Sequence, residues 1–299
     1  MQSVTFKNRQ ITMAGNLFLP AGFQDGVKYP AIVTVHPGGG VKEQTAGVYA
    51  QRLAEQGFVT LAFDASYQGD SGGEPHFLDE PMNRVGDVYA AVDHLSTLPY
   101  VDAARIGVLG ICAGGGFAVK AASVDRRIKA VATASAVNVG SATRKGWDGQ
   151  GSVDTLRATL DALAQQRNAE AAGAEAIHVP YVPPLGDTSA PRDLQEAADY
   201  YLTPRAQHPN AQNKMLMNGL GAWVAFDAFD LVDPLLTQPV LVIAGSEAGS
   251  LWHSQELHAK AQGLKELVVI PGLAHMDLYD GPGVGTALAQ LAPFFKTHL

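Results

Sequence analysis

The stretch Arg105-Ile-Gly-Val-Leu-Gly-Ile-Cys-Ala-Gly-Gly-Gly-Phe117 decides the fold. Its first half is an apolar run, typical of a β-strand that is buried on both faces. The spacing Gly110-Ile-Cys-Ala-Gly114 is that of a strand-turn-helix elbow, in which a nucleophile stands on a strained turn. The helix predicted after the turn would direct its dipole and the backbone N–H of Ala113 toward the thiol and lower its pKa. We therefore predict that Cys112, the only cysteine of the chain, is a nucleophile.

This pattern also has structural interpretations. Free cysteine is often buried and inert, and a G-x-C-x-G spacing is not specific by itself. The alternatives are a buried cysteine in a glycine-rich phosphate loop and one in a plain strand-to-helix turn. The choice depends on which groups follow the other strands.

Composition limits the class of protein. The chain has 299 residues, of which 46% are hydrophobic and 17% are charged, as expected for one large globular domain or a domain with an insertion. A single cysteine excludes an internal disulfide and fits a reducing compartment. A net charge of −8 without a basic block argues against a nucleic-acid partner. The sequence has no apolar signal segment and no apolar run of about 18 residues, so we expect a cytoplasmic protein that is not membrane-bound.

Apolar runs along the rest of the chain alternate with helical patterns. A hairpin is expected over residues 4–19, and further strands at 31–36, 58–63, 127–135, 238–245 and 267–270. Helices are expected at 45–56, 81–98, 254–262 and 283–296. This alternation predicts an α/β fold, with a mostly parallel central sheet and helices on both of its faces.

The alternation stops between about residues 138 and 219. This stretch has helical runs at 153–173 and 191–201 but no buried strand like the others. We interpret it as a helical cap inserted into a core formed by residues 1–137 and 220–299. Substrate specificity would lie in the cap. Its candidate pocket residues are Trp147, Tyr181, Tyr200, Tyr201 and Met215, and Trp223 and Phe226, just after the cap, are further candidates.

Reactive groups in such a sheet belong at the carboxyl ends of the strands. His275 follows the last predicted strand and is our candidate for the base that deprotonates Cys112. The third member of a triad would be a carboxylate between nucleophile and base. Glu247 is the only carboxylate on the loop after the penultimate strand. Three carboxylates just upstream are the alternatives to it: Asp227, Asp230 and Asp233.

A glycine loop follows the first predicted parallel strand. Pro37-Gly-Gly-Gly40 could turn the N–H groups of Gly38 and Gly39 toward an oxyanion, with the N–H of Ala113 as a further donor. The alternative is a loop that is rich in glycine only to make a sharp turn. Glu43, further along, would be either an auxiliary base near the thiol or a charge at a helix N-terminus, and the second role is favoured.

Four segments carry a resemblance to a known family: residues 36–44, 63–75, 110–115 and 271–275. With them the chain resembles the α/β-hydrolase superfamily, and within it the dienelactone-hydrolase-like branch with a cysteine nucleophile. The resemblance covers nearly the whole chain outside the cap. It implies a Cys–His–acid triad, no cofactor or metal, and hydrolysis of an ester, lactone or thioester. Similar proteins usually carry an aspartate on the loop after the penultimate strand, which is absent from Ser246-Glu-Ala-Gly-Ser250.

These features favour a cofactor-independent hydrolase of small acyl substrates that forms an acyl-cysteine. An acyltransferase that uses the same thiol is the first alternative. The second is a catalytically silent protein that binds a ligand or responds to redox conditions. A peptidase is disfavoured, because an amide leaving group needs more acid assistance than thiolate chemistry supplies. A homodimer is compatible with the sequence.

Overall fold

The computed structural model describes residues 1–299 and contains an eight-stranded sheet in the order β1-β2-β4-β3-β5-β6-β9-β10. Only the pairs β1/β2 and β2/β4 are antiparallel. The remaining pairs are parallel, as the alternation of strands and helices predicts. The strands are β1 (Gln2–Asn8), β2 (Ile11–Phe18), β3 (Tyr29–Val35), β4 (Val59–Phe63), β5 (Val101–Ile111), β6 (Ile128–Ala134), β9 (Val240–Gly245) and β10 (Lys265–Ile270).

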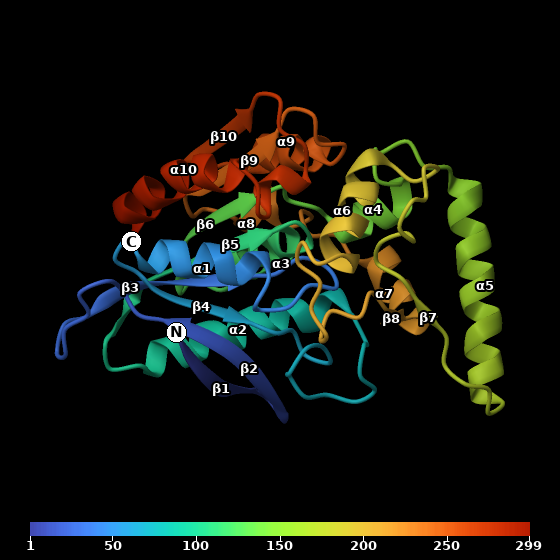
Figure 1. The fold of residues 1–299 in the computed structure, drawn as a ribbon, viewed down its shortest axis with the longest axis horizontal. Helices are drawn as coiled ribbons and strands as arrows, with labels where there is room; N and C mark the ends of the chain where they lie inside the picture. The colour runs from blue at the N-terminus through green and yellow to red at the C-terminus, as the bar shows by residue number, and fades with distance from the viewer.

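Helices cover both faces of this sheet (Figure 1). One face carries α1 (Thr45–Ala54) and α10 (Gly283–His298). The other carries α2 (Pro81–Thr97), α3 (Ala113–Val124), α8 (Val232–Leu235) and α9 (Leu251–Lys260). Successive residues of β5 show why its sequence is continuously apolar, since Val108 is buried under one helical layer and Leu109 under the other. The predicted fold class is confirmed.

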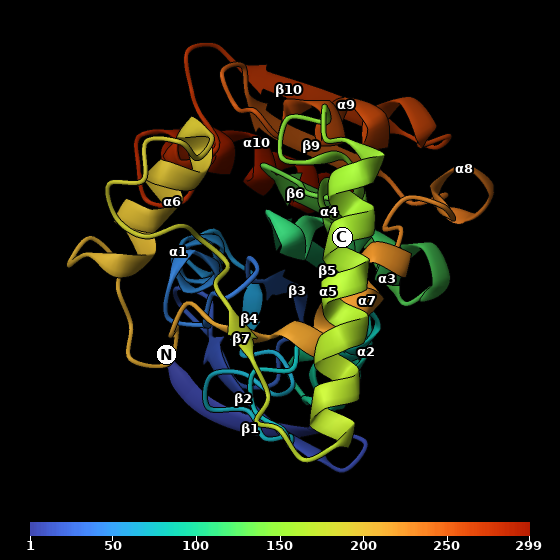
Figure 2. The same cartoon turned by 90° about the vertical axis from the view of Figure 1, so that its right-hand side faces the viewer.

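The segment between β6 and β9 forms a separate layer beside the sheet. It contains α4 (Val139–Lys145), α5 (Val153–Ala171), β7 (His178–Val179), α6 (Arg192–Leu202), β8 (Met215–Leu216), the 3-10 turn η1 (Met217–Gly219) and α7 (Leu220–Ala225). On this side α5 is the helix farthest from the sheet (Figure 1 and Figure 2). Helix α7 packs against α4 and α5, so the layer continues past residue 219. We call residues 138–225 the cap.

The carboxyl ends of the parallel strands face the cap. Residues that follow β3, β5, β6 and β10 line one cavity together with cap residues. The fold therefore brings segments that are far apart in sequence to a single place under the cap. None of the helices combines the length and the apolar character needed to cross a bilayer.

Candidate active site

Cys112 stands on a strained turn between β5 and α3. Its φ is 52° and its ψ is −122°, a backbone conformation that residues other than glycine rarely adopt. Three backbone hydrogen bonds hold the turn. The N–H of Cys112 donates to the carbonyl of Ala134 over 3.0 Å, and its carbonyl accepts from the N–H groups of Gly115 and Val137 over 2.9 Å each. The predicted elbow is therefore present in the backbone.

The glycines on either side of Cys112 are required by close backbone contacts. A Cβ atom at Gly110 would lie 2.2 Å from the carbonyl oxygen of Gly114. A Cβ atom at Gly114 would lie 2.2 Å from the carbonyl oxygen of Val35, at the end of β3. Strand and helix can approach this closely only because these positions have no side chain.

The environment of the thiol differs from the one expected from the sequence. Burial raises the pKa of Cys112, although the Tyr279 hydroxyl and the backbone N–H groups of Ala113 and Gly38 oppose this rise by stabilising the thiolate. The expectation of a lowered thiol pKa is therefore wrong. The backbone N–H groups do lower the thiol pKa as predicted, but the loss of solvent around the sulfur raises it by more.

The glycine loop after β3 contributes to the site in part as predicted. The N–H of Gly38, like that of Ala113, is directed at the sulfur. Gly39 has a different role. Its φ is +69°, and a Cβ atom there would lie 2.5 Å from the ring of Tyr181 in the cap, so glycine allows this ring to lie on the loop.

A buried histidine fixes the start of the glycine loop. His36 accepts a hydrogen bond at Nε2 from the N–H of Ala65 over 3.1 Å, so its neutral ring carries the proton on Nδ1. That nitrogen donates to the carbonyl of Pro37 over 2.7 Å. Burial, together with the nearby Arg84, holds the pKa of His36 well below its usual value. The ring is therefore uncharged and serves to hold the loop.

His275 is buried at the end of the loop after β10. Its Nδ1 forms a 2.6 Å hydrogen bond with the hydroxyl of Ser250, and its Nε2 lies 3.4 Å from the hydroxyl of Tyr279. Burial lowers the pKa of His275 to about 4, and the negative charge of Asp193 opposes this shift. At neutral pH the ring is uncharged and can accept a proton.

Glu247 does not lie where the sequence predicts it. Its carboxylate is half exposed and accepts a hydrogen bond from Nη1 of Arg192 over 3.1 Å. The place at Nδ1 of His275 is taken by Ser250, three residues further along the same loop. The physical reason is that the Glu247 side chain extends to the surface, where it pairs with a cation in water.

The alternative acids upstream are also engaged elsewhere. Asp227 accepts hydrogen bonds from Nδ2 of Asn138 over 2.8 Å and from the N–H of Phe229 over 2.9 Å. Asp230 forms an ion pair with Lys120. Asp233 lies in α8, on the far side of the sheet from α1. None of the three makes a hydrogen bond to His275.

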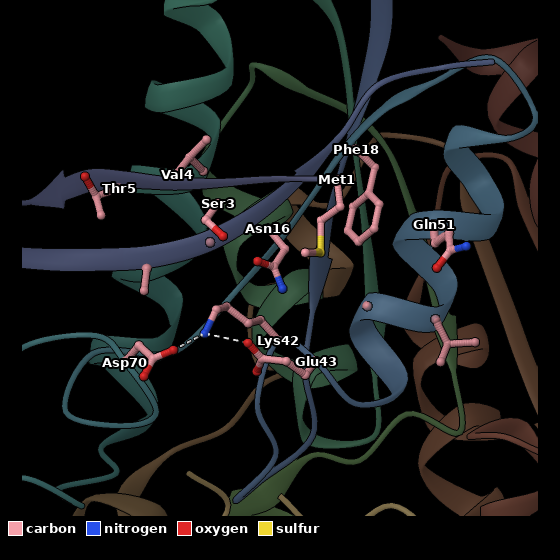
Figure 3. A pocket seen from close by; sticks show the side chains of 14 residues that line it. Met1, Ser3, Val4, Thr5, Asn16, Phe18, Lys42, Glu43, Gln51 and Asp70 are labelled. Atoms are coloured by element: carbon pink, nitrogen blue, oxygen red, sulfur yellow. Dashed lines mark hydrogen bonds and ion pairs between the residues drawn. The ribbon is translucent and has the colours of Figure 1, made fainter. Parts of the chain in front are cut away.

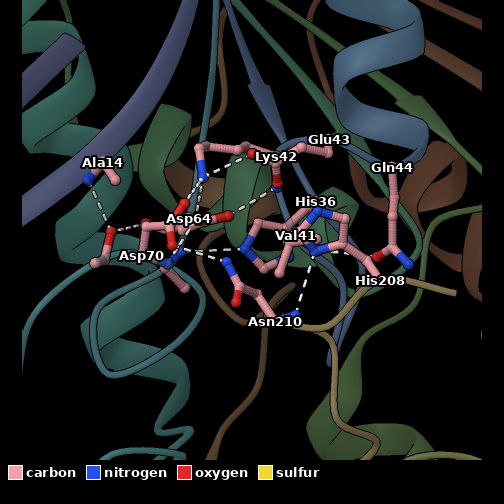
Figure 4. A network of polar contacts seen from close by, with 12 residues as sticks. Ala14, His36, Val41, Lys42, Glu43, Gln44, Asp64, Asp70, His208 and Asn210 are labelled. Carbon is pink, nitrogen blue, oxygen red and sulfur yellow. Dashed lines mark hydrogen bonds and ion pairs between the residues drawn. The ribbon is translucent and has the colours of Figure 1, made fainter. Parts of the chain in front are cut away.

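Glu43 belongs to a charged cluster rather than to the thiol. Its carboxylate lies 2.8 Å from Nζ of Lys42. Figure 3 shows the two side chains joined by a dashed line. The same buried ammonium contacts Asp64 over 2.7 Å and Asp70 over 2.6 Å (Figure 4). Burial disfavours the charge of Lys42, but the three carboxylates more than compensate and raise its pKa. An auxiliary role for Glu43 at Cys112 therefore has no support in the geometry.

This cluster also fastens the cap to the core. Nδ2 of Asn210, on the cap loop after α6, donates to Asp70 over 2.7 Å, and Figure 4 shows the two side chains together. Nearby, Nε2 of Gln44 donates to the carbonyl of Ala206 over 2.8 Å. The cap loop is thus held at two points beside the glycine loop.

A mostly apolar cavity of about 270 Å³ opens onto Cys112 and His275. The cap contributes much of its wall: Val139, Ala142, Thr143, Trp147, Tyr181, Val182, Leu194, Ala197, Tyr201 and Trp223. Of the predicted pocket residues, Trp147, Tyr181, Tyr201 and Trp223 line the cavity. Tyr200, Met215 and Phe226 are buried in the packing around it.

Three residues near His275 are absent from the sequence-based predictions. Tyr279 follows His275 by four positions, and its hydroxyl reaches both the thiol and the imidazole. Ser250 lies on the loop where the sequence predicts a carboxylate. Asp193 lies in the cap and is buried beside Trp147. Only Tyr279 could have been found from the sequence, because it follows His275 by four positions, which is about one helical turn.

The chain is similar to known proteins in both sequence and structure. The model of the dienelactone hydrolase family matches residues 13–177. The uncharacterized protein YcjY of Escherichia coli is 46% identical over 98% of this chain and 96% of its own length. The crystal structure of the hypothetical protein PA2218 from Pseudomonas aeruginosa superposes with a TM-score of 0.93 at 39% identity, covering 100% of this chain and 93% of that one.

A more distant relative has a named activity. The polyketide transferase grgF of a Penicillium species is 25% identical over 84% of this chain and 82% of its own length. The family match spans more than half of the 299 residues and includes the glycine loop and the elbow. The chain therefore belongs to the dienelactone hydrolase family.

Proposed function

We propose that the protein is a cofactor-independent hydrolase of carboxylic esters, lactones or thioesters that acts through an acyl-cysteine at Cys112. One observation carries the proposal. The thiol stands on a strained turn, facing an apolar cavity, with His275 and the N–H groups of Gly38 and Ala113 around it. This is the set of groups that acyl transfer needs: a nucleophile, a base and oxyanion donors.

The reaction begins from a neutral thiol and a neutral imidazole. His275 takes the proton of Cys112 while the sulfur attacks the carbonyl carbon, and the N–H groups of Gly38 and Ala113 hold the oxyanion. The tetrahedral adduct collapses, and the leaving alcohol or thiol takes the proton from the imidazolium. His275 then deprotonates a water molecule, which attacks the acyl-cysteine. The carboxylic acid is released and the proton returns to the sulfur.

The chemistry of sulfur limits the substrate class. A thiolate leaves a tetrahedral adduct more readily than an alkoxide, so the enzyme is suited to strained or activated acyl groups such as lactones, aryl esters and thioesters. Amides are poor substrates because their leaving group needs stronger acid assistance. The wall of the cavity is mostly hydrophobic, which favours an apolar acyl group of modest size.

The test compares the wild type with Cys112→Ala on a panel of aryl esters, lactones and thioesters. We expect the substitution to abolish turnover, because it removes the thiol that forms the acyl intermediate. Intact-protein mass measured during turnover is expected to show an acyl adduct on the wild type only. Undiminished turnover by Cys112→Ala would contradict the proposal.

Acyl transfer to an alcohol or amine is the second candidate. It is favoured by the mostly apolar wall of the cavity, to which Tyr181 and Trp223 of the cap contribute, since an apolar wall disfavours bound water. The relationship to a polyketide transferase points the same way. Product analysis with water and a pool of alcohols and amines separates the two activities. Ester or amide products in excess of free acid would favour transfer.

A further inference from the structure

We propose that Asp193, on the first turn of cap helix α6, is the carboxylate that stabilises the protonated form of His275. It would take the place of an acid on the loop after β9. The inference rests on the proposed function, because the imidazolium arises only if His275 acts as the base. Asp193 is a positioning residue in this scheme, since it acts through its neighbours and does not touch the reacting atoms.

The carboxylate of Asp193 is buried and firmly held. Its residue is 3% exposed. Oδ2 accepts a 2.8 Å hydrogen bond from Nε1 of Trp147 and a 2.7 Å hydrogen bond from the N–H of Gly249. A buried carboxylate is costly to desolvate, so two donors on one oxygen indicate a fixed position rather than an accidental contact.

Both donors lead directly to His275. Gly249 precedes Ser250, whose hydroxyl contacts Nδ1 of the imidazole over 2.6 Å. The ring of Trp147 packs edge-on against the imidazole, with 5.1 Å between the ring centroids. The carboxylate, its two donors and His275 therefore form one connected unit that joins the cap to the loops after β9 and β10, and within it Asp193 and His275 are buried.

Ser250 alone cannot replace a carboxylate. A hydroxyl can donate to Nδ1 or accept from it, so it does not fix which nitrogen carries the proton, and it brings no negative charge. The only carboxylate on the loop from Ser246 to Ser250 is Glu247, which pairs with Arg192 at the surface. A negative charge for the imidazolium must come from elsewhere.

The charged and titratable groups that face His275 differ in their charge at neutral pH. Tyr279 and Cys112 are uncharged, because burial raises the pKa of both side chains. His253 on α9 is also neutral, since burial lowers its pKa to about 3. Asp193 is the group whose charge raises the pKa of His275. The charge available to stabilise the imidazolium thus comes from the cap.

The same charge also acts on the thiol. Asp193 contributes to the raised pKa of Cys112, so it does not favour a thiolate in the resting enzyme. Its benefit appears when His275 holds the proton and the negative charge has moved to the oxyanion, which Gly38 and Ala113 stabilise. Both the acylation and the deacylation steps pass through that state.

The decisive variant is Asp193→Asn. Both hydrogen bonds of Asp193 end on a single oxygen, so the amide oxygen of asparagine can accept them while the charge is lost. We expect kcat/KM to fall by about tenfold or more, because a base whose pKa is lower by about one holds the proton about tenfold less strongly. The acid limb of the pH profile, expected near pH 4 in the wild type, should move to lower pH.

A merely structural role predicts a different profile. If the variant loosened the cap, His275 would gain solvent and its acid limb would move up toward the usual histidine pKa near 6.5. Glu196→Gln is the matched control, because it removes one negative charge from the same helix, where Glu196 pairs with Arg192. Its kcat/KM and its pH profile should equal those of the wild type.

Two further measurements make the test independent of turnover. NMR titration of the His275 ring should give a pKa near 4 in the wild type and a lower value in Asp193→Asn. An unchanged or higher value in that variant overturns the proposal, as does a greater loss of activity in Glu247→Gln than in Asp193→Asn. Cys112→Ala in the same assay tests the proposed function separately, because its retained turnover would refute the mechanism whatever the histidine pKa.

Discussion

Cys112 and His275, the proposed nucleophile and base, are both uncharged at rest. Burial raises the pKa of Cys112 and lowers that of His275 to about 4, so near neutral pH the proton stays on sulfur and the imidazole is neutral. A preformed thiolate–imidazolium pair would need the opposite shifts. A thiol that keeps its proton reacts more slowly with oxidants and alkylating agents than a thiolate does.

Tyr279 offers a direct test of this balance. Its hydroxyl stabilises the thiolate, so we expect Tyr279→Phe to raise the pKa of Cys112 further. The measurement is the rate of alkylation by iodoacetamide as a function of pH, and in the variant this rate should begin to rise at a higher pH than in the wild type. If the thiol pKa is higher by about one, alkylation at pH 8 should be about tenfold slower. Tyr89→Phe, which alters a half-buried tyrosine on α2, is the control. A faster reaction in Tyr279→Phe would show that the hydroxyl does not favour the thiolate.

At the scale of the elements, the sequence predicts the core accurately. Mostly apolar runs such as 58–63 become β4 and its buried neighbour, because a parallel strand covered on both faces buries all of its side chains. The one polar residue in this run, Thr60, donates its hydroxyl to the carbonyl of Ala50. The elbow is equally predictable, since only glycine fits at positions 110 and 114. Groups at the carboxyl ends of strands meet by topology alone, which places Cys112, His275 and Gly38 at one site.

The acid could not be predicted in the same way. Asp193 lies in the cap, and although its helix α6 is amphipathic, the pattern along that helix does not say which part of the core its buried face meets. Ser250 as the partner of His275 leaves no pattern, because serine is common in loops. Glu247 and Glu43 are carboxylates, as the predicted roles require. In the structure, however, Glu247 pairs with Arg192 and Glu43 pairs with Lys42. Which cation a carboxylate meets depends on the tertiary structure and cannot be read from the sequence.

The glycines of the elbow make a stability prediction. In Gly114→Ala the new methyl group would lie 2.2 Å from the carbonyl oxygen of Val35, so strand and helix must move apart. We expect the free energy of unfolding to fall by about 2–3 kcal/mol.

Gly285→Ala in α10 is the matched control, because nothing lies within 4 Å of its Cβ position. That variant should gain about 0.5–1 kcal/mol, because alanine favours a helix. Urea denaturation measures both, and equal stabilities would contradict the close approach.

At the scale of the whole molecule, buried neutral histidines make the fold sensitive to acid. His253 is fully buried on α9, and neither ring nitrogen has a hydrogen-bond partner in the protein. Burial lowers its pKa to about 3, whereas an unfolded chain protonates histidine below about pH 6.5. The unfolded state therefore binds more protons in this range, and stability falls as the pH drops from about 6.5 toward 3.

The variant His253→Phe removes this contribution. We expect the wild type to lose about 2 kcal/mol more stability than His253→Phe between pH 7 and pH 5. At pH 7 the variant should be at least as stable, because an apolar ring replaces a polar one that has no partner. Urea denaturation at the two pH values provides the measurement. Equal losses in the two proteins would show that His253 is accessible to protons in the folded state.

The cap is joined to the core by side chains as well as by the chain itself. The carboxylate of Asp79 accepts a 2.7 Å hydrogen bond from the hydroxyl of Tyr181, and its carbonyl accepts a 2.8 Å hydrogen bond from Nε1 of Trp223. The buried guanidinium of Arg84 pairs with the same carboxylate over 3.4 Å. The two aromatic rings that line the cavity are thus anchored to one buried core residue, Tyr181 through its carboxylate and Trp223 through its backbone carbonyl.

Asp193 sits on the same inserted segment as these rings, which matters for protein engineering and for divergence among relatives. A chimera that exchanges residues 138–225 to alter specificity would also exchange the carboxylate that serves the base. New specificity and lost turnover would then appear together, although the elbow and the histidine loop stay intact. A chimera that keeps its turnover must therefore take residue 193 and the loop around Gly249 from the same parent protein.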